Sequence, residues 1–246
     1  FFEALYRDDF RMYLQPKFIL GERHVYGAEA LARWRRPDGT ILPPAYFMDP
    51  LEKIGYITEL DFYIFEEVLK TLDKWERQKR RKLVISTNFS GRHFDTDGEE
   101  FLNRIQHIFS KYTVPAEYVE IEVTEGVLVK NVHVLERCVN RLHEMGFRVS
   151  IDDFGTGYSS LSVLADMPAD VVKIDKSFIN KDMNGKKMDI LYEIGRMVKI
   201  LQKDIIIEGV ETEEQEKLLI NGGFTCGQGY LCNKPIPIGE FEKLYL

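Results

Sequence analysis

The chain has 246 residues, of which 44% are hydrophobic and 30% are charged, and this composition is typical of a globular domain and not of a disordered, collagen-like or coiled-coil chain. Its 33 Lys and Arg residues against 40 Asp and Glu residues give a net charge of -7, which argues against a DNA or RNA polymer or an anionic membrane as a partner. No apolar run approaches the roughly 20 residues that span a bilayer, so we expect a single domain over residues 1–246 without direct membrane contact.

Short β-branched runs and longer amphipathic patterns alternate along the chain. The runs predict strands at residues 83–88, 119–123, 147–151, 171–174 and 205–207. Apolar residues at the spacing of one helix face predict helices near residues 60–75, 101–112, 135–145 and 191–201. A last helix is expected between Thr212, which forms a capping box with Gln215, and the glycines Gly222 and Gly223. This alternation predicts an α/β fold with a largely parallel sheet, and the chain length favours a closed (β/α)8 barrel.

Polar side chains stand at or just past the ends of the predicted strands. They are Asn88, Glu122, Asp152 with Asp153, Lys173 and Glu208, joined by Glu29 upstream and Gln228 downstream. In a parallel barrel the C-terminal strand ends share one face, where catalytic residues gather. Most of these side chains carry carboxylate or amide oxygens, which suit hard cations such as Mg²⁺ or Mn²⁺.

The cysteines and the first residue of the chain indicate in which compartment of the cell the protein works. Cys138, Cys226 and Cys232 are odd in number and include no C-x-x-C pair, which predicts neither a disulfide framework nor a zinc site and favours a reducing, cytoplasmic location. The chain starts at Phe1 without a Met or a targeting segment, as expected of a domain excised from a larger signalling protein, including a membrane-anchored one.

The strand-end positions also carry the motifs of a known family. Glu29-Ala30-Leu31 followed by Arg33-Trp34 resembles the signature of the EAL-domain cyclic di-GMP phosphodiesterases. The resemblance runs from about Tyr6 to Leu244. It continues through Gln15-Pro16, Thr87-Asn88-Phe89-Ser90, Glu122-Val123-Thr124-Glu125, the segment from Asp152 to Leu161, Lys173-Ile174-Asp175, Glu208-Gly209-Val210-Glu211-Thr212 and Gln228-Gly229-Tyr230.

This resemblance implies a specific fold and reaction. The fold would be a TIM-like (β/α)8 barrel with one early strand antiparallel to the others. The reaction would be hydrolysis of one phosphodiester bond of cyclic di-GMP to give linear pGpG in bacterial second-messenger signalling. Two Mg²⁺ or Mn²⁺ ions per site would be required, and Ca²⁺ would inhibit. The resemblance also implies a homodimer that forms through the face bearing the loop after Asp153.

The resemblance assigns roles residue by residue. The implied catalytic residues are Lys173, which holds the attacking water, with Glu208, Glu29 and Asp152. The implied metal ligands are Glu29, Asn88, Glu122, Asp152, Asp153 and Glu208, with Asp152 bridging the two ions. The implied substrate contacts are Gln15, Leu31, Arg33, Asp175, Glu211 and Gln228. The implied loop-stabilising residues are Glu125, Gly155 and Gly157, and we interpret the two glycines as allowing a switch between productive and unproductive loop arrangements.

Two other classes of function compete with the enzyme. A non-catalytic receptor would bind cyclic di-GMP and pass the signal to a partner, and a protein-interaction scaffold would bind no nucleotide. Degenerate members of the family usually lose a metal ligand or the glycine-rich loop, whereas this chain retains both. We therefore expect hydrolysis.

Overall fold

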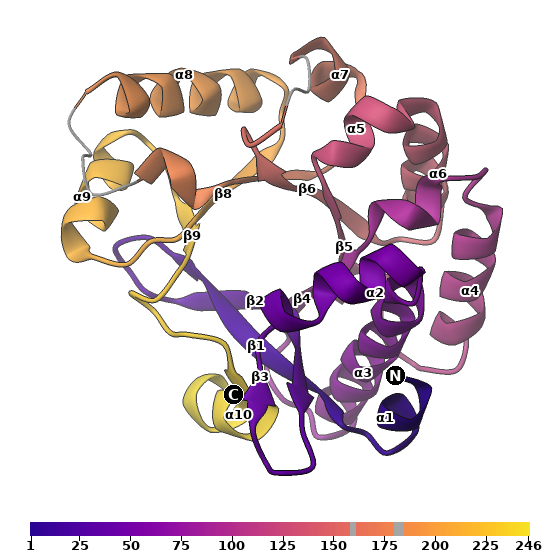
Figure 1. Ribbon diagram of the computed structural model, residues 1–246. Coiled ribbons are helices and arrows are strands. Elements are labelled where there is room, and N and C mark those ends of the chain that lie inside the picture. The colour runs from indigo at the N-terminus through magenta and orange to yellow at the C-terminus, as the bar shows by residue number, and fades with distance from the viewer. Residues whose placement is uncertain (158–160, 180–184) are drawn as a thin grey trace.

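Eight strands close into a barrel in the computed structural model, which describes residues 1–157, 161–179 and 185–246 (Figure 1). The barrel strands are β1 (Phe10–Ile19), β2 (Val25–Arg35), β4 (Val84–Phe89), β5 (Val119–Thr124), β6 (Arg148–Phe154), β7 (Val171–Ile174), β8 (Asp204–Glu208) and β9 (Cys226–Gln228). Two short strands, β3 (Ile41–Leu42) and β10 (Ile236–Pro237), pair with β2 and β1, respectively. The five predicted strands correspond to β4 through β8, and the predicted TIM-like barrel is confirmed.

The antiparallel strand is β1. It pairs antiparallel with β2 on one side and with β9 on the other, whereas the remaining neighbours in the barrel pair in parallel. This register sets Gln15 opposite Glu29 and Lys17 opposite Gln228. Residues from the first strand therefore face the same interior as residues more than 200 positions later.

Helices surround the barrel (Figure 1). They are α1 (Phe2–Tyr6), α2 (Met48–Ile54), α3 (Ile57–Arg77), α4 (Glu99–Phe109), α5 (Gly126–Lys130), α6 (Val132–Glu144), α7 (Leu161–Asp166), α8 (Lys186–Ile200), α9 (Glu213–Asn221) and α10 (Ile238–Tyr245). Single 3-10 turns are η1 (Pro44–Tyr46), η2 (Gly91–Phe94), η3 (Ala116–Tyr118) and η4 (Lys176–Ile179). The four predicted amphipathic helices are α3, α4, α6 and α8. The capping box of Thr212 and Gln215 opens α9 as expected.

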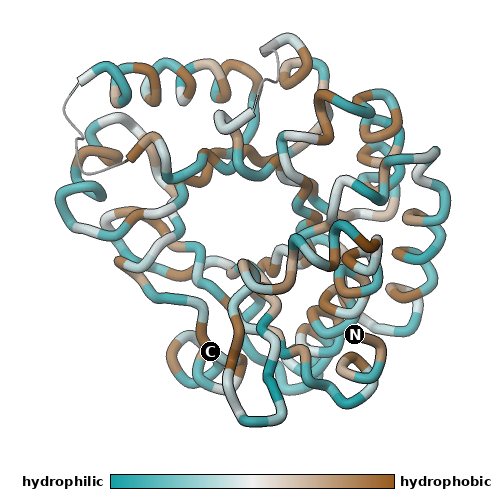
Figure 2. The backbone as a smooth tube through the Cα atoms, in the orientation of Figure 1, coloured by the Kyte–Doolittle hydropathy of each residue, from teal (hydrophilic) through white to brown (hydrophobic). Residues whose placement is uncertain are grey.

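Among the residues that the structure describes, no helix combines the length and the hydrophobicity needed to cross a membrane. Figure 2 shows hydrophobic and hydrophilic residues alternating along the strands and along the outer helices, as amphipathic elements require.

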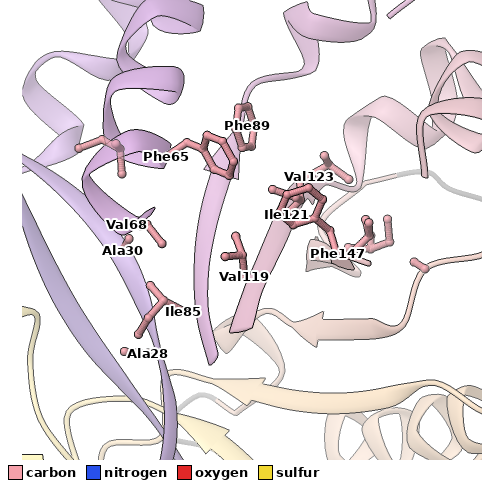
Figure 3. Packing of buried hydrophobic residues seen from close by; sticks show 14 of the residues in the cluster. Ala28, Ala30, Phe65, Val68, Ile85, Phe89, Val119, Ile121, Val123 and Phe147 are labelled. Atoms are coloured by element: carbon pink, nitrogen blue, oxygen red, sulfur yellow. The ribbon is translucent and has the colours of Figure 1, made fainter. Parts of the chain in front are cut away.

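The hydrophobic core lies between the strands and the helices. On β5, Val119, Ile121 and Val123 point outward to this layer, where Figure 3 shows them near Phe147 and across from Phe65 and Phe89. The rings of Phe65 and Phe89 have centroids 5.8 Å apart in an edge-on arrangement. Because side chains alternate along a strand, the intervening Glu120 and Glu122 point into the barrel, where both are buried. The barrel interior is therefore polar at the level of these carboxylates.

Candidate metal and active site

Seven predicted site residues from seven different strands lie in one cluster. Glu29 comes from β2, Asn88 from β4, Glu122 from β5, Asp152 from β6, Lys173 from β7, Glu208 from β8 and Gln228 from β9. Asp153 follows Asp152 at the same mouth. The first seven residues come from seven different strands, and Asp153 is the residue after Asp152. The order and register of the strands therefore determine the geometry of the site.

Lys173 is the centre of this cluster. Its Nζ atom lies 2.9 Å from Glu208 Oε1, 3.0 Å from Asp152 Oδ1, 3.1 Å from Glu122 Oε2 and 3.2 Å from Glu29 Oε2. The side chain is completely buried, and burial by itself would lower the pKa of its ammonium group. The four carboxylates outweigh burial and raise that pKa well above its usual value. Lys173 is therefore a permanent cation and hydrogen-bond donor rather than a base.

The carboxylates form two groups that share Asp152. Oxygen atoms of Glu29, Glu122 and Asp152 lie within 4.8 Å of one another, and so do oxygen atoms of Asp152, Asp153 and Glu208. Two adjacent all-oxygen clusters with one common carboxylate have the donor chemistry of two hard divalent cations. Two-metal enzymes hold their ions about 3.5–4 Å apart, and a carboxylate common to both groups suits such a pair of ions.

The backbone at Asp153 explains how consecutive residues serve one site. Strand alternation would turn Asp152 and Asp153 to opposite faces, but the pairing of β6 with β7 shifts register between Ile151 and Phe154. Asp153 has a φ of 56°, a left-handed conformation that is uncommon outside glycine. The Asp153 N–H donates to Asp152 Oδ1 at 2.9 Å. This local irregularity brings both carboxylates to the mouth.

The acidities of these carboxyls differ sharply. Burial raises the pKa of Asp152 well above its usual value, and repulsion from Glu208, Glu122 and Glu29 adds to that effect against the attraction of Lys173. Burial likewise raises the pKa of Glu208 and of Asp153. Burial would also raise the pKa of Glu122, but Lys17 and Lys173 outweigh it and lower the pKa to about 2. The surroundings therefore favour the ionised form of Glu122 and oppose ionisation of Asp152 and Glu208.

Two amides hold Glu29. Asn88 Nδ2 donates to Glu29 Oε1 at 2.6 Å, and Gln228 Nε2 donates to Glu29 Oε2 at 2.6 Å and to Gln15 Oε1 at 3.3 Å. The Oε1 atom of Gln228 is buried without a hydrogen-bond partner among the described residues. A buried acceptor without a partner is costly unless a water or an ion satisfies it. The structure therefore places an unsatisfied oxygen beside the acidic cluster.

Glu125 contacts the loop after Asp153. Its Oε2 accepts the N–H of Gly155 at 3.0 Å and the N–H of Gly157 at 2.8 Å. Gly155 has a φ of 96°, and a Cβ atom there would lie 2.4 Å from the ring of Phe178, so only glycine fits. Positions 158–160 of the predicted motif lie outside the described residues.

The predicted substrate residues are spread around the mouth. Leu31 lines a cavity of about 310 Å³ that also borders Asn88, Asp152 and Asp153 and has apolar walls from Met48, Ile57, Leu60 and Ile64. Arg33 is half-buried over the ring of Tyr13, 5.5 Å from its centroid. Asp175 begins the turn into η4 and accepts the Ser177 N–H at 2.8 Å. Glu211 is exposed beyond the end of β8, and its backbone N–H donates to Gln215.

Sequence reasoning missed a second buried lysine. Lys17 Nζ lies 2.8 Å from Glu120 Oε1 and 2.8 Å from Glu122 Oε1, and all three side chains are almost completely buried. The period-two pattern of strands held the signal, because Lys17 follows Gln15 by two residues and Glu120 precedes Glu122 by two. Lys17 therefore faces inward together with Gln15, and Glu120 faces inward together with Glu122; Gln15 and Glu122 are predicted site residues.

Comparisons with known proteins agree with this arrangement. The family model described as the EAL domain matches residues 1–235. Signaling protein YkoW of Bacillus subtilis is 36% identical over 99% of this chain and 30% of its own length, and cyclic di-GMP phosphodiesterase NbdA of Pseudomonas aeruginosa is 32% identical over 98% and 31%. The chain thus spans about a third of the length of these relatives. The solved structure of the PaMucR phosphodiesterase in complex with c-di-GMP is 30% identical with a TM-score of 0.90, covering 97% of this chain and 96% of that one.

Proposed function

Because this chain belongs to the EAL domain family, we propose that it hydrolyses cyclic di-GMP to linear pGpG with the aid of two divalent cations, Mg²⁺ or Mn²⁺. The observation that carries this proposal is the pair of carboxylate clusters that share Asp152. The names of the similar proteins support the choice of substrate, since NbdA is named a cyclic di-GMP phosphodiesterase and PaMucR is described in complex with c-di-GMP.

The residues of the two clusters fit the cations in charge and in donor type. Glu29, Asn88, Glu122 and Asp152 would hold one ion, and Asp152, Asp153 and Glu208 the other. The buried, unsatisfied Oε1 of Gln228 fits a role in ordering water beside them. When bound, the cations supply an activated water and offset the charge of the phosphoryl oxygens.

Each residue then has a task of its own. The Lys173 ammonium, fixed among four carboxylates, would donate a hydrogen bond to the attacking water and stabilise negative charge that grows in the transition state. Glu208, whose pKa is raised by burial, would accept the proton that the water loses. Glu29, held by two amides, and Asp152 would keep the reacting groups in place.

We place the substrate across the mouth. The Arg33 guanidinium would contact a phosphate, and the apolar cavity beside Leu31 would accept a guanine base. Gln15 and Gln228, which lie side by side, and Asp175 and Glu211, on the loops after β7 and β8, would complete the contacts.

Assembly and location follow as further proposals. We propose that the domain works in the cytoplasm as a homodimer, joined through the face that bears the loop after Asp153. Light scattering across a concentration series tests this, and a monomer at every concentration would contradict it.

A chromatographic assay of nucleotides tests the reaction. Purified protein is incubated with cyclic di-GMP and Mg²⁺ or Mn²⁺, beside Glu29→Ala and an exposed-carboxylate control, Glu213→Ala. Conversion to pGpG by the native chain and by the control, but not by Glu29→Ala, is expected. Intact cyclic di-GMP that stays bound to the native protein would instead support the non-catalytic receptor. No binding in the presence of Mg²⁺ would support the scaffold.

A further inference from the structure

The buried pair of Lys17 and Glu120 lies beneath the acidic cluster. Glu120 precedes Glu122 by two residues on β5, so it stands one layer deeper in the barrel, about 7 Å farther from the mouth. Lys17 reaches from β1 and donates to one oxygen of each carboxylate at 2.8 Å. The exposed fraction of the Lys17 side chain is 2%, so water does not compete for these contacts.

Glu122 is consequently held at both oxygens. Its Oε1 accepts from Lys17, and its Oε2 accepts from Lys173 at 3.1 Å. Lys173 also contacts Glu29, Asp152 and Glu208, so Oε2 is the oxygen that faces the cluster. Rotation of the carboxylate to present both oxygens to that cluster would break the contact with Lys17 in a site closed to water.

We propose that Lys17 is a positioning residue that restricts Glu122 to ligation through one oxygen and thereby favours small cations over Ca²⁺. The inference rests on the proposed function, because it concerns the metal preference of the same site. Mg²⁺ needs six ligands at about 2.0–2.1 Å in near-octahedral geometry, whereas Ca²⁺ takes about six to eight oxygens and readily binds carboxylates through both. A carboxylate that can bind through only one oxygen suits Mg²⁺, and it offers Ca²⁺ one ligand fewer than a carboxylate that binds through both oxygens.

Glu120 has a different part in this arrangement. It balances the charge of Lys17, so the pair adds no net charge beneath the cluster. Lys17 therefore acts on Glu122 through geometry rather than through the total charge of the site. Removing both members of the pair keeps the net charge constant and isolates the positional effect.

The test measures metal affinity directly. Mn²⁺ and Ca²⁺ are each titrated by calorimetry into the full chain after chelator treatment, for the native protein, Glu120→Gln and the double variant Lys17→Met/Glu120→Gln. Loss of a residue that orients a ligand typically weakens metal binding about 10- to 100-fold. In the double variant we expect Mn²⁺ affinity to fall about tenfold or more while Ca²⁺ affinity holds or rises. In Glu120→Gln, which keeps Lys17 on Glu122, the ratio of the two affinities should stay native.

Two outcomes would overturn the inference. An unchanged ratio of Ca²⁺ to Mn²⁺ affinity in the double variant would exclude a role for Lys17 in selectivity while leaving the proposed function intact. Absence of Mn²⁺ binding by the native protein would overturn the metal site itself, and this inference with it. Thermal unfolding verifies that each variant is folded. If the double variant is not, Lys17→Leu/Glu120→Leu replaces the buried ion pair by two apolar side chains, also removes the donor to Glu122, and carries the same expectation.

Discussion

Asp152 and Lys173, on neighbouring strands β6 and β7, form a buried ion pair in which Oδ1 lies 3.0 Å from Nζ. Burial opposes the charge on both residues, but the neighbouring carboxylates affect the two charges in opposite ways. Three other carboxylates around Lys173 stabilise its charge, whereas the same carboxylates oppose a negative charge on Asp152. One lysine therefore balances four carboxylates, and the remaining negative charge is what a cation would neutralise.

Removal of Lys173 should destabilise the metal-free protein. In Lys173→Met, four carboxylates lose their common partner, and breaking a buried ion pair typically costs about 3–5 kcal/mol. Urea unfolding without divalent cations should show this loss, and Mn²⁺ should recover part of it while cyclic di-GMP hydrolysis stays abolished. The exposed Lys217→Met provides the control. Equal stability of Lys173→Met and the native protein would refute the central role of this ammonium group.

Metal binding should release protons. Because burial raises the pKa of Asp152 and Glu208, the metal-free site keeps protons at pH values where ordinary carboxyls have lost them. A cation requires the ionised carboxylates, so Mn²⁺ affinity should rise with pH until it passes these raised pKa values and then level off. Calorimetry in two buffers of different ionisation enthalpy measures the protons released. Asp152→Asn, which removes one of these groups, should release fewer.

Glu125 should hold the loop after Asp153. In Glu125→Ala the N–H groups of Gly155 and Gly157 lose their shared acceptor, and an unsatisfied donor costs about 1–3 kcal/mol where it is buried. Hydrogen exchange at these two amides should become faster, and turnover should fall.

Gly157→Val should impair turnover as well, since a Cβ atom there would lie 3.1 Å from the Glu125 carboxylate. Native turnover in Gly157→Val would argue against the loop as a switch.

Adjacent residues of β5 should separate stability from metal binding. Ile121→Ala removes a buried side chain from the core between β5 and the helices, which typically costs about 2–5 kcal/mol, and should leave Mn²⁺ affinity near native. Glu122→Gln changes the opposite face of the strand and should weaken Mn²⁺ binding strongly. Thermal unfolding and calorimetry on both variants make the comparison. Strong Mn²⁺ binding by Glu122→Gln would remove Glu122 from the ligand set.

Much of the barrel and of its mouth was predictable from local pattern. The strands β4 through β8 appear in the sequence as short β-branched runs. Within the last three residues of these strands lie Asn88, Glu122, Asp152, Lys173 and Glu208. A parallel barrel gathers strand ends on one face whatever the sequence separation. Position along the chain was therefore enough to collect these residues into one site.

The order of residues alone is enough to identify the carboxylates, amides and lysine near the strand ends and the motifs of the family. Which of these groups share a partner depends on how the strands are arranged in the barrel. The antiparallel register of β1 sets Lys17 inside the barrel, where it meets Glu120 and Glu122 from more than 100 residues away. The left-handed backbone at Asp153 brings a second consecutive carboxylate to the mouth. The period of two along a strand indicates that Lys17 faces inward, but neither its partners nor the backbone at Asp153 follows from local pattern. Cross-barrel contacts depend on how distant strands align, and a shift of one residue would turn these side chains to the other face.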